Sequence, residues 1–220
     1  MILASPKWEH KILFDDGSIT HLTIENPITF RKYVLELQSQ LKGDDGSFVL
    51  SQDNAEVSIS KNLAMLSDSI CFEFDTRKIN AKIVKDIIGM ACSGEYCKDV
   101  YPLISSITCM AENLVEAYPL NISYDDPTIE SLGKMLSFHL EPEYDNSCDK
   151  LLEWMTINHD VLNIGNFIIL NPELYFSEEE LAVISSEASS SKHNVLFIDA
   201  TCKYRYDRNI IIDEDNCEIL

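Results

Sequence analysis

Apolar and polar positions in the first third of the chain follow a mixed strand and helix pattern. Apolar runs of strand length occupy residues 11–14, 19–25, 48–50 and 70–74. Asp15 to Ser18 is typical of a hairpin turn, because Gly17 tolerates positive φ. Apolar residues recur at helical spacing over 28–41, and Gly43 ends the predicted helix. This region therefore predicts α/β structure that begins with a hairpin.

The hydrophobic period changes to 3.6 residues in the middle of the chain. Apolar residues between Ile79 and Ala91 form one stripe, and Lys78, Lys82 and Lys85 lie on another side of the same helix. Three further helices are predicted at 102–118, 128–138 and 148–162. The middle of the chain is thus predicted to be a mostly helical insertion.

Strand patterns return in the last quarter of the chain. Residues 167–170 form a continuous apolar run, typical of a buried parallel strand. Ser177 and Glu180 have the spacing of a capping box, which begins a helix. Residues 195–198 are the next strand, so this part predicts a right-handed βαβ unit. Short edge strands are predicted at 210–212 and 218–220.

These patterns predict an α/β fold with a split domain. A head domain would consist of residues 1–76 and 165–220, and a helical leg insertion would consist of residues 77–164. A chain of 220 residues with 45% hydrophobic and 25% charged residues is globular. No apolar run approaches the roughly 20 residues of a membrane span, and the first residues do not resemble a signal peptide. We expect a cytoplasmic protein without a membrane association.

Charge restricts the partners of the protein. The formal net charge is −20, which repels nucleic acid at long range. Basic residues are nevertheless concentrated in two groups, which are Arg77, Lys78, Lys82, Lys85 and Lys98, and Lys203, Arg205 and Arg208. Either group is a solvated face by default, but a local basic surface is also how an acidic protein could bind DNA.

Signatures of catalysis are missing from the sequence. Neither a GxxxxGK[ST] nor a GxGxxG motif occurs, and the glycines of the turn KGDDG lie among carboxylates that would repel phosphate. The five histidines are dispersed without an HExxH motif, and no serine lies in a GxSxG motif. The seven cysteines are scattered without a CxxC pair, which argues against a disulfide framework or a zinc site. We expect a protein that is not an enzyme.

Oxygen ligands cluster in one polar loop. Asn121, Asp125, Asp126 and Glu130 fall within ten residues, and hard oxygen ligands of this kind suit Ca²⁺. An alternative interpretation is structural, because Asp126 would be a good N-cap before Pro127 at the first helical position. By spacing alone the cap is favoured, since the loop is not an EF-hand.

The order of the segments resembles a known family, the small spacer-acquisition protein of type II-A CRISPR systems, a Csn protein that forms a ring on DNA. The resemblance is carried by DDGSITHLTIENPITFRKYV, SKNLAMLSDSICFEFDTRKINAKIVKDI, LNISYDDPTIESLGKMLSFHLEPEYDNSCDKLLEWM and NFIILNPELYFSEEELAVISSEASSSKHNVLFIDA. It implies a head like a degenerate P-loop NTPase that binds no nucleotide, a helical leg, and a homotetrameric ring. It also implies sequence-independent binding of double-stranded DNA ends, calcium bound among leg carboxylates, and action with the CRISPR integrase proteins and the RNA-guided nuclease.

The resemblance assigns roles to particular residues. Asp125, with Asn121, Asp126 and Glu130 beside it, falls where the family binds calcium. Lys134 matches a lysine that faces the DNA-bearing hole, whereas His139 stands where a second lysine is expected. A histidine there weakens the DNA contact at pH 7, because it is largely neutral.

Two further DNA-binding candidates rest on the helical pattern alone. Lys82 and Lys85 lie opposite the apolar stripe of their predicted helix.

The leading functional hypothesis is therefore a non-enzymatic ring that binds DNA ends during spacer acquisition. An acidic interaction adaptor without a direct grip on DNA is the main alternative, supported by the charge of −20. A nucleotidase or NTPase is a third alternative.

Overall fold

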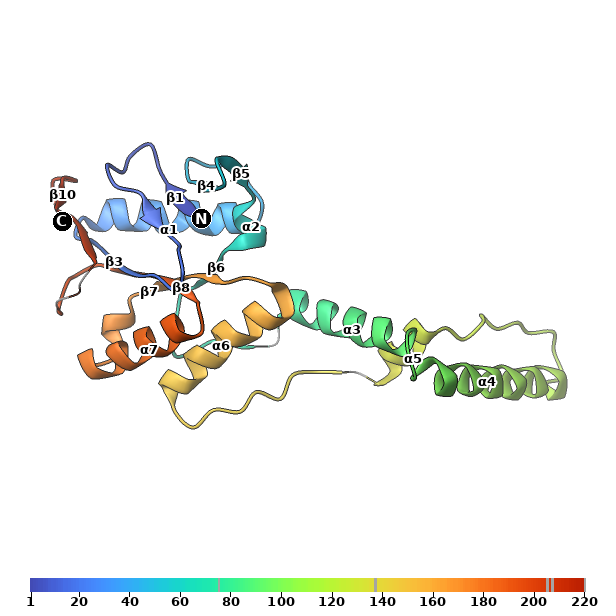
Figure 1. Ribbon diagram of the computed structural model, residues 1–220. Helices are drawn as coiled ribbons and strands as arrows, with labels where there is room; N and C mark the ends of the chain where they lie inside the picture. Colours follow the sequence, from blue (N-terminus) through green and yellow to red (C-terminus); the bar gives the residue numbers. More distant parts are fainter. Residues whose placement is uncertain (75, 137, 205, 207, 220) are drawn as a thin grey trace. The chain divides into compact units, whose positions relative to one another are not determined.

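The computed structural model of the chain describes residues 1–74, 76–136, 138–204, 206 and 208–219. The chain divides into two compact units, which Figure 1 shows as ribbons. The α/β unit comprises Met1–Phe74 and Pro142–Leu220, and the helical unit comprises Asp75–Glu141. The helical insertion therefore ends at Glu141 and not at the predicted residue 164.

Helix α6 (Ser147–Leu162) accounts for this difference. The sequence pattern predicted the helix itself but assigned it to the insertion, and that assignment is wrong. Leu151, Trp154 and Met155 of α6 are buried in the α/β unit. The Trp154 ring packs edge-on against Phe167 of strand β7, with 5.4 Å between the ring centroids. Helical periodicity shows that one face is buried but does not show which element buries it.

The larger sheet of the α/β unit has the strand order β10-β9-β3-β8-β7-β6. Its strands are β3 (Ile19–Ile24), β6 (Ala64–Leu66), β7 (Asn166–Leu170), β8 (Asn194–Asp199), β9 (Asn209–Ile212) and β10 (Glu218–Ile219). All neighbouring pairs are parallel except β9 and β10. The predicted βαβ unit is β7, α7 (Glu178–Ser190) and β8, and Ser177 and Glu180 form the predicted capping box. Strand β9 lies inside the sheet rather than at its edge.

A smaller antiparallel sheet has the order β2-β1-β4-β5. Its strands are β1 (Ile2–Ala4), β2 (Ile12–Leu13), β4 (Val49–Gln52) and β5 (Ala55–Val57). The predicted first hairpin is wrong, because β2 pairs with β1 whereas β3 belongs to the larger sheet. The turn itself exists, since the Ser18 amide donates to the Asp15 carbonyl at 3.0 Å and Gly17 has φ +77°.

The predicted strand at 70–74 is also wrong. Oδ1 of Asp68 accepts hydrogen bonds from the Ile70 and Cys71 amides at 2.9 and 2.8 Å, which makes this segment a turn. The strand of this region is β6, which follows the short helix α2 (Ile59–Asn62). A short 3-10 helix, η1 (Pro172–Leu174), follows β7.

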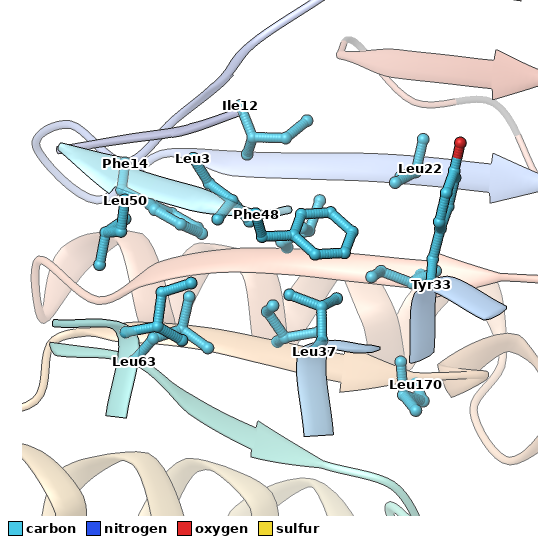
Figure 2. Close-up of a cluster of buried hydrophobic side chains, with 14 of the residues drawn as sticks. Leu3, Ile12, Phe14, Leu22, Tyr33, Leu37, Phe48, Leu50, Leu63 and Leu170 are labelled. Atoms are coloured by element: carbon cyan, nitrogen blue, oxygen red, sulfur yellow. The ribbon is translucent and has the colours of Figure 1, made fainter. Parts of the chain in front are cut away.

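The main core of the α/β unit lies between the two sheets and helix α1 (Pro27–Leu41). Figure 2 shows Tyr33 and Leu37 of α1 among side chains that include Leu50 of the smaller sheet, Leu22 of the larger sheet, and Phe48, which directly precedes β4. Along β3, Leu22 and Ile24 belong to this core. Because side chains alternate along a strand, His21 and Thr23 face the opposite side of the sheet. That alternation places His21 on the second face, beside Phe197 of β8.

The helical unit contains α3 (Arg77–Ala91), α4 (Cys97–Ala117) and α5 (Ile129–Leu136). Helix α4 begins five residues before the predicted position, with Pro102 inside it. Helices α3 and α5 pack closely, because Gly133 of α5 is buried and a Cβ added there would lie 3.1 Å from Cγ1 of Ile88. No helix in the described part of the chain is long and apolar enough to cross a membrane.

Candidate nucleic-acid interface

Helix α3 presents the most basic helical surface of the helical unit. Thr76 caps it by accepting a hydrogen bond from the Ile79 amide at 3.2 Å. Residues 78, 82 and 85 recur at helical spacing, so the lysines there share one exposed face, while Ile79 is buried. Lys82 forms an ion pair with Asp86 one turn later, so part of this positive charge is balanced locally. The face nevertheless keeps a positive excess.

Lys134 lies on the neighbouring helix α5 and is exposed. It directly follows Gly133, the residue of α5 that approaches Ile88 of α3. The sequence-predicted lysines of α3 and α5 therefore lie on two helices that pack against each other. His139 follows α5 and is exposed, with its Nε2 3.5 Å from Oε1 of Glu141. A carboxylate neighbour makes His139 a poorer contact for phosphate than the lysine expected at that position.

The predicted calcium ligands do not gather in the single chain. Asn121, Asp125, Asp126 and Glu130 are all exposed. Within the described residues, no three His, Cys, Asp or Glu side chains lie close enough to hold a metal ion. Calcium binding by these residues therefore stays a prediction.

The alternative role of Asp126 as an N-cap is wrong. Helix α5 begins at Ile129, and Thr128 caps it, because its Oγ1 accepts from the Ser131 amide at 3.1 Å. Oγ of Ser131 accepts from the Thr128 amide at 2.9 Å in return. This reciprocal pair satisfies two amides at the helix start, and Pro127 lies before the helix rather than at its first position.

Helix α4 has an apolar side but no buried residue. Its apolar side chains recur at alternating steps of three and four residues, namely Val100, Leu103, Ile107, Met110 and Leu114. Leu103, Met110 and Leu114 are 53%, 57% and 62% exposed. This spacing is that of a coiled-coil seam, in which each apolar residue inserts between residues of a facing helix. The sequence contained this signal, but the helical prediction did not use it.

In the α/β unit, a short turn joins the parallel strand β3 to the start of helix α1. Only Glu25 and Asn26 separate the strand from the helix, and neither is glycine. Oδ1 of Asn26 accepts from the Ile28 and Thr29 amides at 3.0 and 3.2 Å. Nδ2 of Asn26 donates to the Glu214 carbonyl at 2.9 Å, in an acidic turn. These helix-start amides are therefore already bonded.

A buried polar cluster at the carboxyl ends of β7 and β8 escaped the sequence prediction. Glu173 and Asp199 are 4% and 5% exposed. The Glu173 carboxylate accepts from the Tyr206 hydroxyl at 2.5 Å and from the Lys203 amide at 2.8 Å. Burial, and then the nearby Glu173 charge, raise the pKa of Asp199 to about 7. Burial and the hydrogen bond to Glu173 also raise the pKa of Tyr206. The only signal of this cluster in the sequence was Asp199, an acidic residue that ends the buried strand β8.

Comparisons with known proteins identify the family of the chain but not a close structural relative. No curated protein matches the chain. A putative ABC transporter ATP-binding protein from Pyrococcus furiosus is similar over 96% of this chain and 97% of its own, with 10% identity and a TM-score of 0.42. That likeness is too distant to support a conclusion. The family model described as CRISPR-associated protein (Cas_Csn2) matches residues 40–216 and confirms the family expected from the sequence. The chain therefore belongs to the Cas_Csn2 family of CRISPR-associated proteins.

Proposed function

We propose that this protein is a non-enzymatic, cytoplasmic DNA-binding protein that acts in CRISPR adaptation, the acquisition of new spacers. It would bind double-stranded DNA ends without reading their sequence, as a homotetrameric ring. The observation that carries this proposal is the charge of α3. In a chain of net charge −20, this one helix has four basic residues and one acidic residue. Family membership supplies the CRISPR-associated role.

Phosphate contacts from exposed lysines would hold the duplex. Lys134 on α5 and Lys82 and Lys85 on α3 are the candidate contacts, and His139, whose Nε2 lies 3.5 Å from Oε1 of Glu141, would be a weaker one. Such contacts position a protein on DNA but carry no base information. The acidic remainder of the surface would keep the duplex away from other faces and leave them for the integrase proteins and the RNA-guided nuclease.

Ring assembly would bury the apolar face of α4 against a second copy of this chain. A helix of 21 residues without a buried side chain needs a partner for its apolar face. Most oligomers of one chain have closed symmetry, so repeated contacts of this kind can close into a ring. Mass in solution tests the assembly. Leu103→Glu with Leu114→Glu should yield monomers, and Leu174→Glu, at an equally exposed site of the α/β unit, should not.

The turn from β3 to α1 supports a head that resembles a P-loop NTPase but lacks nucleotide binding. A P-loop needs free backbone amides to cradle phosphate, whereas Asn26 already occupies two of them. Thermal unfolding with ATP and magnesium tests this point. We expect no shift in Tm, and a nucleotide-induced rise would favour the NTPase alternative.

The decisive experiment compares DNA topologies. A closed ring can thread a free duplex end and slide, so linear DNA should bind and a covalently closed circle should not. Affinity for linear DNA should fall steeply with added salt, because each phosphate contact releases a counterion. Equal binding of linear and circular DNA would refute threading.

One observation favours a second candidate function. The net charge of −20 suits an acidic adaptor that only contacts other proteins. Absence of DNA binding at low salt by a folded oligomer would support this adaptor and refute the ring on DNA.

A further inference from the structure

Helix α4 lacks the packing that stabilises a helix of the α/β unit such as α6. Helix α6 has six buried residues, including Leu151 and Trp154. Helix α4 is longer and has none. From residue 80 to residue 132, all of which the structure describes, no residue is buried. Most of the stability of a protein helix comes from the packing of its apolar face, so the single chain gives α4 little of this stabilisation.

The two ends of α4 are also poorly stabilised. Tyr96 is the N-cap residue and makes no side-chain capping hydrogen bond. Helices α1, α3, α6 and α7, by contrast, each begin with a side-chain cap. The last turn of α4 has no basic residue, and Glu116 there lies at the negative end of the helix dipole. Neither end therefore supplies the stabilisation that a cap or a favourable charge would add.

The interior of α4 consists in part of residues that disfavour a helix. Pro102 has no amide hydrogen to donate to the Lys98 carbonyl. The hydroxyls of Ser106 and Thr108 donate to carbonyls one turn earlier, at 2.9 and 3.1 Å, and such bonds slightly weaken a helix. Valine, isoleucine and threonine, whose branched side chains lower helix propensity, occupy five of its 21 positions. Helix α4 is therefore weak by itself as well as unpacked.

The apolar seam of α4 suits a second copy of the same helix. The seam consists of Val100, Leu103, Ile107, Met110 and Leu114. In coiled coils, charged residues beside the seam select the partner, but the residues beside this one are uncharged, namely Ile104, Ser106, Ala111 and Asn113. No charged residue occurs from position 100 to position 111. Two copies of a chain with net charge −20 repel each other, and this uncharged surface is where they can pack without facing like charges.

We propose that α4 folds only on association, unfolded in the single chain and helical when its seam packs against α4 of a second copy. Apolar burial at the seam would then offset the conformational entropy that the helix loses on folding. This inference rests on the assembly proposed above and goes beyond it, because helices that are already folded can also assemble. It makes the fold of this part of the helical unit depend on the concentration of the protein.

Amide hydrogen exchange of the full chain over a dilution series tests the proposal, with mass in solution measured at the same concentrations. We expect α4 to be protected in the assembled protein and to exchange at the rate of an unfolded chain in the monomer. Helix α6 is the internal control and should stay protected in both. The monomeric variant Leu103→Glu with Leu114→Glu should show the same loss of protection in α4 alone.

The two measurements separate this inference from the proposed assembly. Protection of α4 in the monomer reached by dilution would overturn folding on association and leave the assembly intact. A wild-type chain that is monomeric at every concentration would refute the second copy as the partner of α4, and the ring with it.

A variant outside the seam tests the same coupling through affinity. Pro102→Ala restores an amide donor and makes α4 a better helix, so less free energy is lost when the helix folds. If folding accompanies association, the dissociation constant of the assembly should fall at least about tenfold. Pro6→Ala, the same change at an exposed turn of the α/β unit, is the control and should leave the constant unchanged. An unchanged constant in Pro102→Ala would mean that α4 is already folded in the single chain, and would overturn the proposal.

Discussion

The hydroxyl of Tyr206 donates a hydrogen bond of 2.5 Å to Oε1 of the buried Glu173 carboxylate. The same carboxylate accepts from the Lys203 amide through Oε2, and the Lys203 ammonium donates to the Glu173 carbonyl at 2.8 Å. These bonds hold part of the segment between β8 and β9 against η1. Tyr206, which stacks on His21 of β3, is therefore held in place by one buried acid.

Removing the Tyr206 hydroxyl tests how much this arrangement stabilises the α/β unit. Tyr206→Phe keeps the ring on His21 but leaves a buried carboxylate with one donor fewer. We expect a loss of about 1–3 kcal/mol in the free energy of unfolding, measured by urea denaturation. Tyr175→Phe, at a site 45% exposed, is the control and should change stability by less than about 0.5 kcal/mol. Equal stabilities of Tyr206→Phe and wild type would show that the bond contributes nothing net.

Two buried groups should give the stability opposite dependences on pH. His21 has a pKa of about 3 in the fold against an ordinary 6.5, so its contribution is lost as pH falls from 6.5 towards 3. Asp199 has a pKa of about 7 against an ordinary 3.8, so its contribution is lost as pH rises from 3.8 towards 7. Each slope is at most about 1.4 kcal/mol per pH unit. Urea denaturation at a series of pH values measures both.

Difference curves separate these two groups from the other carboxylates. The stability of His21→Phe minus that of wild type should rise as pH falls below 6.5. The difference for Asp199→Asn should rise as pH increases from 3.8 to about 7. A flat curve for either variant would mean that burial does not shift that pKa.

The contact between α3 and α5 should depend on the small size of Gly133. A Cβ there would lie 3.1 and 3.3 Å from two side-chain atoms of Ile88, so Gly133→Leu should push α5 away from α3. Amide hydrogen exchange of α5 should accelerate to the rate of an unpacked helix. Gly89→Ala is the matched control in α3, where a Cβ meets nothing within 4 Å, and it should stabilise by about 0.5–1 kcal/mol. Retained protection of α5 in Gly133→Leu would contradict the described packing.

DNA contact predicts a specific response to charge reversal on α5. Lys134→Glu should weaken binding to all duplex sequences alike and lower the slope of log affinity against log salt, by about one for each contact removed. Gel shifts over a range of salt concentrations measure both effects. Lys42→Glu, at an exposed site of the α/β unit, is the control and should bind as wild type does. Unchanged affinity of a folded, oligomeric Lys134→Glu protein would place the duplex on another face.

Calcium should not stabilise the single chain, because no three His, Cys, Asp or Glu side chains among its described residues lie close enough to hold a metal ion. The monomeric variant Leu103→Glu with Leu114→Glu should melt at the same temperature in calcium and in chelator. Calcium binding by the assembled protein stays a prediction, and its signature would be a rise in Tm that Asp125→Asn with Asp126→Asn abolishes. A calcium-dependent rise in the monomer would contradict the geometry of the loop.

Local features of this protein followed from the sequence alone. The capping box of Ser177 and Glu180, the buried strands β7 and β8, and the extent of α6 are all present where the pattern placed them. Each depends on residues only a few positions apart in the sequence. Their spacing alone therefore predicts the hydrogen bonds of the cap and the periodicity of the strand or helix. The family was also accessible from sequence, because the order of its segments spans most of the chain.

Tertiary structure decided which elements face one another. The sequence showed a turn at Asp15 to Ser18 but not that its two strands join different sheets, and it showed α6 but not that Phe167 lies beneath it. It likewise could not bring Glu173, Asp199 and Tyr206 together, since Glu173 comes after β7 whereas Asp199 ends β8 and Tyr206 comes after β8. A hydrophobic period records that one side of a segment is buried and carries no information about the partner. The partner depends on which distant surfaces meet when the chain closes its long loops.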